Sequence, residues 1–207
     1  MVPENIRIKF RKTGRLKYIS HLDLCRTMCP AMIRAKIPLW YTEGFNPHPK
    51  LVFAQPLPLF VESDCEFLDI KITENVSHDE LKARLRAAFT DELYVTDVYT
   101  PVSKFTEIAY AGYFIACDVK LTEAEIAEKL SSDIVVTKNV KGKEKELNIR
   151  PQICSFEICD GGYFAVLDAS GSSYLNPDLF CKAIFGSSAD CSVTRRSWFK
   201  ADMSCFS

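Results

Sequence analysis

The stretch from Tyr41 to Lys50, which reads YTEGFNPHPK, contains the residues of this chain that are best suited to a binding site. Pro47 and Pro49 bracket His48, and each proline fixes its own φ and pushes the preceding residue towards extended geometry. Gly44, just before them, permits a positive φ. We therefore expect a stiff, non-helical loop, and such loops commonly position binding residues. The alternative is a tight connection into the next strand, with His48 merely solvated.

A second histidine lies upstream, in the segment YISHLD that contains His21 and Asp23. In the first turn of a helix, the dipole disfavours protonated His21, and a neutral imidazole suits a general base or a ligand. Asp23 is better placed to cap that turn than to act as an acid. If the following loop folds back over the helix start, His21, Asp23 and His48 would form a site for a phosphate or a metal. His21 and His48 are the candidates for catalysis, and a surface role is the alternative for each.

Residues 6–11 alternate apolar and basic side chains, which is the period of a β-strand. Arg7, Lys9 and Arg11 would then share one basic face that can contact successive phosphates, although such charges also protect a strand edge from pairing. The predicted ligand- or RNA-binding residues are Arg7, Lys9, Arg11, His21, Asp23, Phe45, Asn46, His48 and Lys50.

Composition excludes several classes of protein. The chain has 207 residues, 47% hydrophobic side chains and a net charge of −1, which suits one large or two small packed domains. It contains no apolar run approaching the ~18 residues that span a bilayer, and its first residues lack the apolar segment of a signal peptide. The sequence therefore predicts a cytoplasmic protein without a membrane partner.

The nine cysteines are scattered and mostly lie in apolar patterns, so free thiols are expected. Cys25 and Cys29 match the first two ligands of the CxxxCxxC motif of radical SAM enzymes, but Met32 stands where the third would be. Neither this pair nor Cys154 with Cys159 has the remaining ligands of an iron–sulfur or zinc site. The sequence predicts no metal and no cofactor.

Helix-capping patterns predict four helices, at about residues 20–36, 77–89, 122–131 and 176–185, with a kink or break at Pro30. The order strand–helix–strand–strand–helix–strand runs over residues 1–100 and returns over 108–200. The second copy has an extra hairpin near 140–149 that turns at Lys141–Lys143. We therefore expect an α+β chain with two tandem ferredoxin-like (βαββαβ) modules and antiparallel sheets, at residues 1–103 and 104–207.

Four segments of the first half, at residues 12–24, 44–50, 57–62 and 66–70, resemble a bacterial family known as the radical SAM-associated, or radical SAM-linked, domain of unknown function. In that family the domain occurs alone or attached to a radical SAM protein. The resemblance therefore implies a stand-alone form with a radical SAM protein as partner. The paired ferredoxin-like order is also similar to CRISPR repeat-processing RNA endonucleases, which use a histidine near the start of the first helix, where His21 would fall. Such a likeness of fold does not fix function.

Three functions are compatible with these features. The first is a non-catalytic RNA-binding module that presents RNA to a partner enzyme, with aromatic side chains stacking on bases. The second is an adaptor that binds a radical SAM enzyme without touching nucleic acid. The third is a ribonuclease that depends on His21 and His48. We expect the first, because basic and aromatic residues flank the rigid loop.

Overall fold

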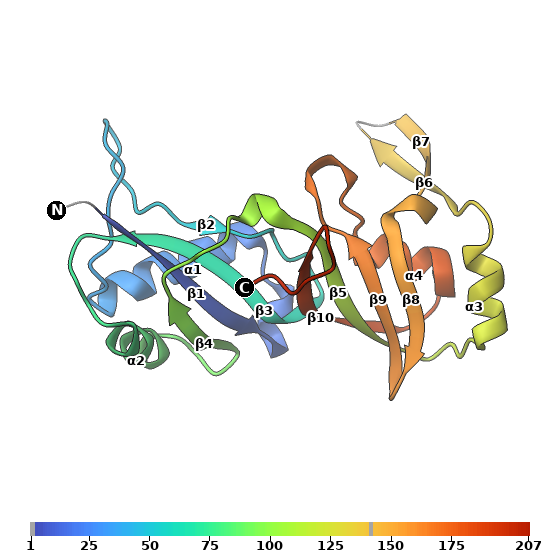
Figure 1. Cartoon of the computed structure of the whole chain (residues 1–207), viewed down its shortest axis with the longest axis horizontal. Helices are drawn as coiled ribbons and strands as arrows, with labels where there is room; N and C mark the ends of the chain where they lie inside the picture. The colour runs from blue at the N-terminus through green and yellow to red at the C-terminus, as the bar shows by residue number, and fades with distance from the viewer. Residues whose placement is uncertain (1–2, 141–142) are drawn as a thin grey trace. The chain divides into compact units, whose positions relative to one another are not determined.

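The computed structural model describes residues 3–140 and 143–207 of the chain. Two units are present: unit 1 extends to Phe105 and includes Ser207, and unit 2 runs from Thr106 to Phe206. Helices and antiparallel strands occur in both units, and the described residues contain four α-helices (Figure 1). The expected α+β class with antiparallel sheets is confirmed.

Unit 1 contains an antiparallel sheet in which the strand order is β4-β1-β3-β2. Its elements are β1 (Glu4–Lys12), α1 (His21–Arg34), β2 (Val52–Phe53), β3 (Val61–Ile72), α2 (His78–Ala88) and β4 (Leu93–Tyr99). The core of this unit joins the apolar positions of β1 to buried residues of both helices, which include Met28 and Leu81. The burial of these periodic apolar positions is the main driving force for this packing.

Helix α1 begins where its capping pattern predicts. The Ser20 hydroxyl accepts a hydrogen bond from the Asp23 backbone N–H at 3.1 Å, which satisfies one of the free donors of the first turn. The helix then runs without interruption through Pro30 to Arg34, so the expected division at Pro30 does not occur. Met28, Ala31 and Met32 are buried on either side of the proline, and this packing outweighs the loss of one backbone hydrogen bond.

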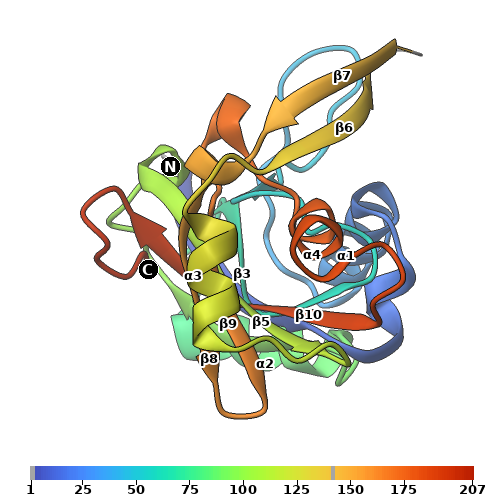
Figure 2. The same ribbon diagram turned by 90° about the vertical axis from the view of Figure 1, so that its right-hand side faces the viewer.

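Unit 2 contains a second antiparallel sheet, with the order β10-β5-β9-β8, and a separate two-stranded hairpin, β6-β7. Figure 2 shows this hairpin extending away from β8 and β9. The turn expected at Lys141–Lys143 includes residues 141 and 142, which lie outside the described residues. The elements are β5 (Ile108–Cys117), α3 (Glu123–Leu130), β6 (Val135–Val140), β7 (Lys143–Asn148), β8 (Ile153–Cys159), β9 (Gly162–Asp168), α4 (Pro177–Phe185) and β10 (Cys191–Lys200).

The two sheets follow one rule of connection when the β6-β7 hairpin is set aside. In each unit the last strand pairs with the first, the first with the third, and the third with the second. In each unit a helix joins the first strand to the second and another joins the third to the fourth. Within the described residues, none of the helices has the length and apolar character needed to cross a membrane.

Candidate functional site

Residues 41–49 form a narrow hairpin-like arm between α1 and β2, visible in Figure 1 as the thin loop that projects from unit 1. Tyr41 and Pro49 make a β-bridge at its base. The Thr42 N–H donates to the His48 carbonyl at 3.0 Å, and the His48 N–H donates to the Thr42 hydroxyl at 3.2 Å. Phe45, near the tip, is fully exposed at 112% of its reference area. The predicted stiff loop is therefore a braced arm that presents an aromatic ring to solvent.

The His48 side chain braces this arm from within. Its Nδ1 lies 3.0 Å from the Asn46 carbonyl oxygen and 3.3 Å from the Thr42 hydroxyl oxygen. A carbonyl oxygen only accepts hydrogen bonds, so Nδ1 must carry the proton in this arrangement. The neutral ring then keeps Nε2 as an acceptor. Asn46 contributes its backbone to the brace, while its side chain is exposed.

A pocket of about 400 Å³ lies between α1 and the base of the arm. Helix α1 lines it with Cys25, Arg26 and Cys29, and the arm side contributes His48 and Lys50. The thiols of Cys25 and Cys29 are half-buried, and burial raises the pKa of both, so they are neutral near pH 7. The charge in this pocket therefore comes from Arg26 and Lys50.

His21 does not line that pocket, but it contacts a residue that does. Its Nε2 lies 3.6 Å from the Cys25 sulfur, and its ring meets Phe53 edge-on with 4.8 Å between ring centroids. Burial lowers the pKa of His21, the Glu66 carboxylate opposes this, and the Lys12 ammonium adds to the lowering. Burial, the largest of these causes, thus favours the neutral imidazole expected at this position.

Asp23 and Asn46 also lie outside that pocket, although they were expected within it. The Asp23 carboxylate accepts a hydrogen bond from the Ser20 hydroxyl at 2.7 Å and lies 3.5 Å from Arg26. Ser20 is the residue that caps the helix, and Asp23 supports its hydroxyl. Of the four residues predicted to share a pocket, only His48 lines this one, and Lys50, which was expected at the rim, lines it too.

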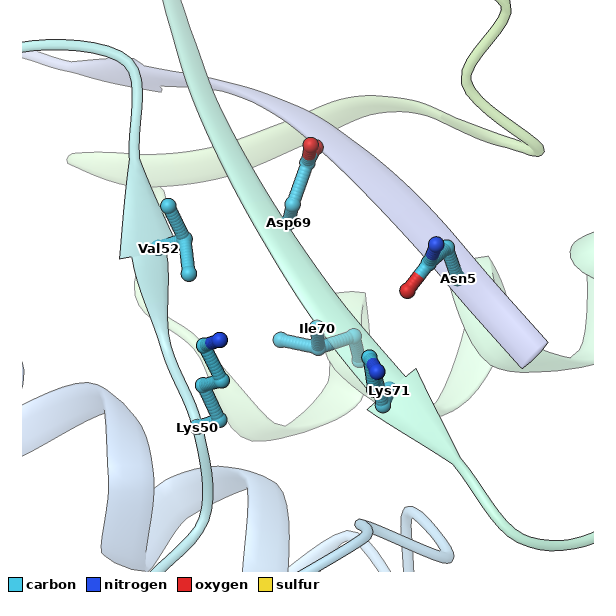
Figure 3. Close-up of a pocket in the computed structure, with 6 residues that line it drawn as sticks. All are labelled: Asn5, Lys50, Val52, Asp69, Ile70 and Lys71. Carbon is cyan, nitrogen blue, oxygen red and sulfur yellow. The ribbon is translucent and has the colours of Figure 1, made fainter. Parts of the chain in front are cut away.

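A second, smaller pocket of about 160 Å³ shares Lys50 with the first (Figure 3). Figure 3 shows Lys50 approaching from the segment before β2, Lys71 from β3 and Asn5 from β1. Lys71 lies over the Trp40 ring, with its ammonium nitrogen 5.2 Å from the ring centroid. Lys50 therefore belongs to both pockets and connects the arm to the surface of the sheet.

Asp69 also lines this second pocket, and its carboxylate forms an ion pair with Arg7. Two parallel contacts join them, Nε to Oδ1 at 2.7 Å and Nη2 to Oδ2 at 2.9 Å. Such a bidentate pair satisfies much of the carboxylate charge. Within residues 3–140 and 143–207, neither Lys50 nor Lys71 makes an ion pair. The pocket is therefore suited to an anion.

The prediction that β1 carries an exposed basic face is wrong for Arg7. This side chain is 0% exposed, donates to the Ser103 carbonyl at 2.9 Å, and lies 4.3 Å from the Phe105 ring centroid. Alternation along a strand separates two faces, but it does not show that the polar face meets water. Here the segment that follows β4 covers it.

Lys9 and Arg11 differ from Arg7, and from each other, in their exposure to solvent. Lys9 is half-buried, with its ammonium nitrogen 5.7 Å from the Phe67 ring centroid, whereas Arg11 is exposed and lies over Tyr94 at 4.8 Å. Of the three predicted phosphate contacts on β1, Arg11 is therefore the one that is fully accessible.

Lys71 and Trp40 were absent from the predicted site. Lys71 sits at a polar position of β3, and Trp40 precedes the arm, where its backbone N–H donates to the Lys71 carbonyl at 2.8 Å. No motif marks either residue, because the pair forms only when the arm folds back beside β3. In the described part of the chain, no group of three histidine, cysteine, aspartate or glutamate side chains is arranged to hold a metal ion.

Comparison with known proteins places the chain in a family but not with any characterised member. No curated protein matches it. One family model matches residues 5–177, which include nearly all of unit 1, the arm and the residues that line both pockets. Because this match covers most of the 207 residues, the chain belongs to the family described as uncharacterised proteins conserved in bacteria, DUF2344.

Proposed function

We propose that this protein is a non-catalytic RNA-binding module that acts with a partner enzyme, and that unit 1 binds the RNA through the arm, Lys50 and Lys71. The observation that carries the proposal is the fully exposed Phe45 on a braced arm whose base adjoins Lys50 and Lys71, which make no ion pair within the described residues. The sequence predicted an RNA interface on β1, where Arg7 is buried. The proposed interface lies instead on the arm and the second pocket.

A single-stranded RNA suits this surface better than a duplex. An exposed aromatic ring can stack on an unpaired base, and such stacking contributes about 1–3 kcal/mol per base. The lysines can contact the backbone on either side of that base, with the salt dependence typical of phosphate contacts. Because the Thr42–His48 contacts already hold the arm, little conformational entropy is lost when RNA binds.

The same geometry argues against catalysis by the two histidines. His21 is packed against Phe53 and Cys25, and the Nδ1 atom of His48 is committed to the Asn46 carbonyl. The ribonuclease considered above depends on His21 and His48 together, so it would need both imidazoles within reach of one phosphate. These contacts favour structural roles for both, which supports a binding module.

The architectural part of the proposal is that each unit is a ferredoxin-like module, with the division near residues 103–104. The strand order shared by the two sheets supports it, since the split βαβ arrangement has antiparallel neighbours and this sequence of connections. The partner enzyme would be a radical SAM protein, as the resemblance of residues 12–24 and 44–50 implies.

An adaptor function is the second candidate, because an exposed aromatic pair lies elsewhere on unit 1. Tyr18 and Phe60 are 59% and 67% exposed, and their rings meet edge-on with 5.9 Å between centroids. Exposed aromatic side chains of this kind are enriched at protein–protein interfaces. RNA binding and partner binding can therefore use different surfaces of the same unit.

Fluorescence polarisation with labelled single-stranded RNA at several salt concentrations tests the RNA proposal. The double variant Lys50→Ser, Lys71→Ser should flatten the log–log salt dependence of affinity by roughly 1.4, since each phosphate contact on a single strand contributes about 0.7. Lys182→Ser, which removes an exposed lysine of α4, is the matched control and should leave the slope unchanged. Absence of binding by the wild-type protein at low salt would reject the proposal in favour of the adaptor.

A further inference from the structure

Unit 2 contains a cluster of three thiols that the proposed function does not use. Cys117 ends β5, Cys191 begins β10, and the two residues are direct partners in the antiparallel ladder. Their sulfur atoms are 3.0 Å apart. Cys181, on α4, is the third member, and it lies close enough to Cys191 for each thiol to influence the pKa of the other.

The three thiols differ in their access to solvent. Cys117 and Cys181 are buried, whereas Cys191 is half-buried. Burial raises the pKa of Cys181 to about 12, and burial together with the neighbouring thiols raises the pKa of Cys191 as well. Cys181 and Cys191 are therefore neutral thiols at physiological pH, and Cys191 is the thiol that an outside reagent meets first.

Each pair in the cluster involves Cys191. It faces Cys117 across the sheet and Cys181 on the helix. In the part of the chain that the structure describes, no three such side chains have the arrangement of a metal site, so a shared ion does not account for the cluster. Bond formation between two of the sulfurs accounts for it better, because a disulfide needs only a further approach of about 1 Å from the present separation.

We propose that Cys117 and Cys191 form a reversible cross-strand disulfide when the protein meets a hydroperoxide, and that Cys181 can exchange into it at the Cys191 sulfur. The proposal does not depend on RNA binding. It assigns unit 2 a site of thiol oxidation that would join β5 to β10 covalently.

The reaction balances with one hydroperoxide. The Cys191 thiol first gives up its proton, and the resulting thiolate, which is a small fraction because burial raises the pKa of this group, attacks the terminal peroxide oxygen. The O–O bond breaks, and the departing alkoxide takes up that proton to become an alcohol. Cys191 is then a sulfenic acid. The Cys117 thiolate attacks the Cys191 sulfur, the S–O bond breaks, and the hydroxide leaves as water after protonation. Two thiols have lost two electrons and two protons, and the peroxide has gained them.

Exchange gives Cys181 a distinct role. Its thiolate can attack the Cys191 sulfur of the disulfide, which releases Cys117 as a thiol and forms the Cys181–Cys191 bond. No net oxidation accompanies this step. The thiol buried by α4 would thus move the cross-link from the β5–β10 ladder to the helix, and a small thiol could reverse either bond by the same chemistry.

Treatment of the folded protein with hydrogen peroxide, followed by denaturation, alkylation of free thiols and peptide mass mapping, tests this assignment. We expect a Cys117–Cys191 cross-linked peptide, with a minor Cys181–Cys191 peptide, and loss of both after dithiothreitol. Cys191→Ser should abolish both cross-links, and Cys181→Ser should keep the first. Cys205→Ser, at an exposed position, is the matched control and should change neither.

If a variant fails to fold, peptide mass mapping of the wild-type protein alone tests the proposed disulfide. Retention of free thiols at positions 117 and 191 after peroxide, while the exposed Cys154 and Cys205 are oxidised, would overturn the proposal. Cross-links between separate molecules only, seen as dimers on non-reducing gels, would overturn it too.

Discussion

In both units, the chain between the first helix and the second sheet strand contains a large additional segment. In unit 1 this segment is the 41–49 arm, between α1 and β2, and in unit 2 it is the β6-β7 hairpin, between α3 and β8. The arm has an exposed Phe45 and two lysines near its base, whereas the hairpin alternates exposed charges of both signs, as at Glu144, Lys145 and Glu146. The two segments therefore differ in chemistry, because residues 135–148 contain four lysines and two glutamates but no aromatic side chain that could stack on a base.

Each unit also buries an arginine within its sheet, and the surroundings differ. Arg7 of β1 pairs with Asp69 of β3, whereas Arg195 of β10 lies 4.2 Å from the Trp198 ring centroid and donates to the Tyr113 hydroxyl at 3.2 Å. Buried cations need such partners because desolvation is costly. A basic residue at a polar strand position is thus as compatible with a structural role as with a binding role.

The largest expected effect comes from breaking the ion pair of unit 1. Asp69→Ala removes the bidentate carboxylate from the fully buried Arg7, which keeps its hydrogen bonds to Ser103, and should lower the free energy of unfolding by about 3–5 kcal/mol. Arg7→Met should cost less, because the Asp69 side chain is 24% exposed and can be rehydrated. Urea unfolding measures both, with Arg11→Met as an exposed control within about 0.5 kcal/mol of wild type. An Asp69→Ala variant as stable as that control would contradict the structural role of Arg7.

Oxidation of the thiols in unit 2 provides a second test of how the two units differ. A Cys117–Cys191 disulfide closes a span of 74 residues and should stabilise the oxidised protein by roughly 2–4 kcal/mol. Thermal unfolding before and after peroxide measures the shift. Cys191→Ser should show none, and an equal shift in that variant would assign the effect to other thiols.

Removal of the aromatic ring at the arm tip should weaken RNA binding without affecting stability. Phe45→Ala should lower affinity by about 1–3 kcal/mol, because one stacked base is lost, and should leave the salt slope unchanged. Lys145→Ala in the β6-β7 hairpin is the comparison from unit 2 and should leave affinity unchanged. An equal loss of RNA affinity in both variants would contradict the assignment of RNA binding to the arm rather than the hairpin.

The smallest effect concerns pH. Burial lowers the pKa of His21 from its ordinary value of 6.5, so the unfolded chain binds more protons than the folded one near and below that pH. Stability should therefore fall as pH drops through about 6.5 towards the lowered pKa of the folded state, and the dependence should weaken in His21→Leu. Denaturant unfolding between pH 7.5 and 5 provides the test, and an unchanged pH profile in the variant would contradict the assignment.

The elements of this fold could be predicted from the sequence because their signals are local. The helix start at Ser20 and Asp23, and the alternation of Ile6 and Ile8, depend on neighbours along the chain and were confirmed. The burial of Arg7 could not be predicted, because its cover comes from residues 103–105. Lys71 was missed for the same reason, since its place beside Lys50 depends on the path of the arm.

Ultraviolet crosslinking of the wild-type protein to single-stranded RNA, with the crosslinked peptides identified by mass spectrometry, tests the central claim most directly. We predict crosslinks within residues 40–50, centred on Phe45, and their loss in Phe45→Ala. The β6-β7 hairpin should remain free of them. Crosslinks confined to residues 143–148, or to unit 2 as a whole, would contradict the assignment of RNA binding to the arm.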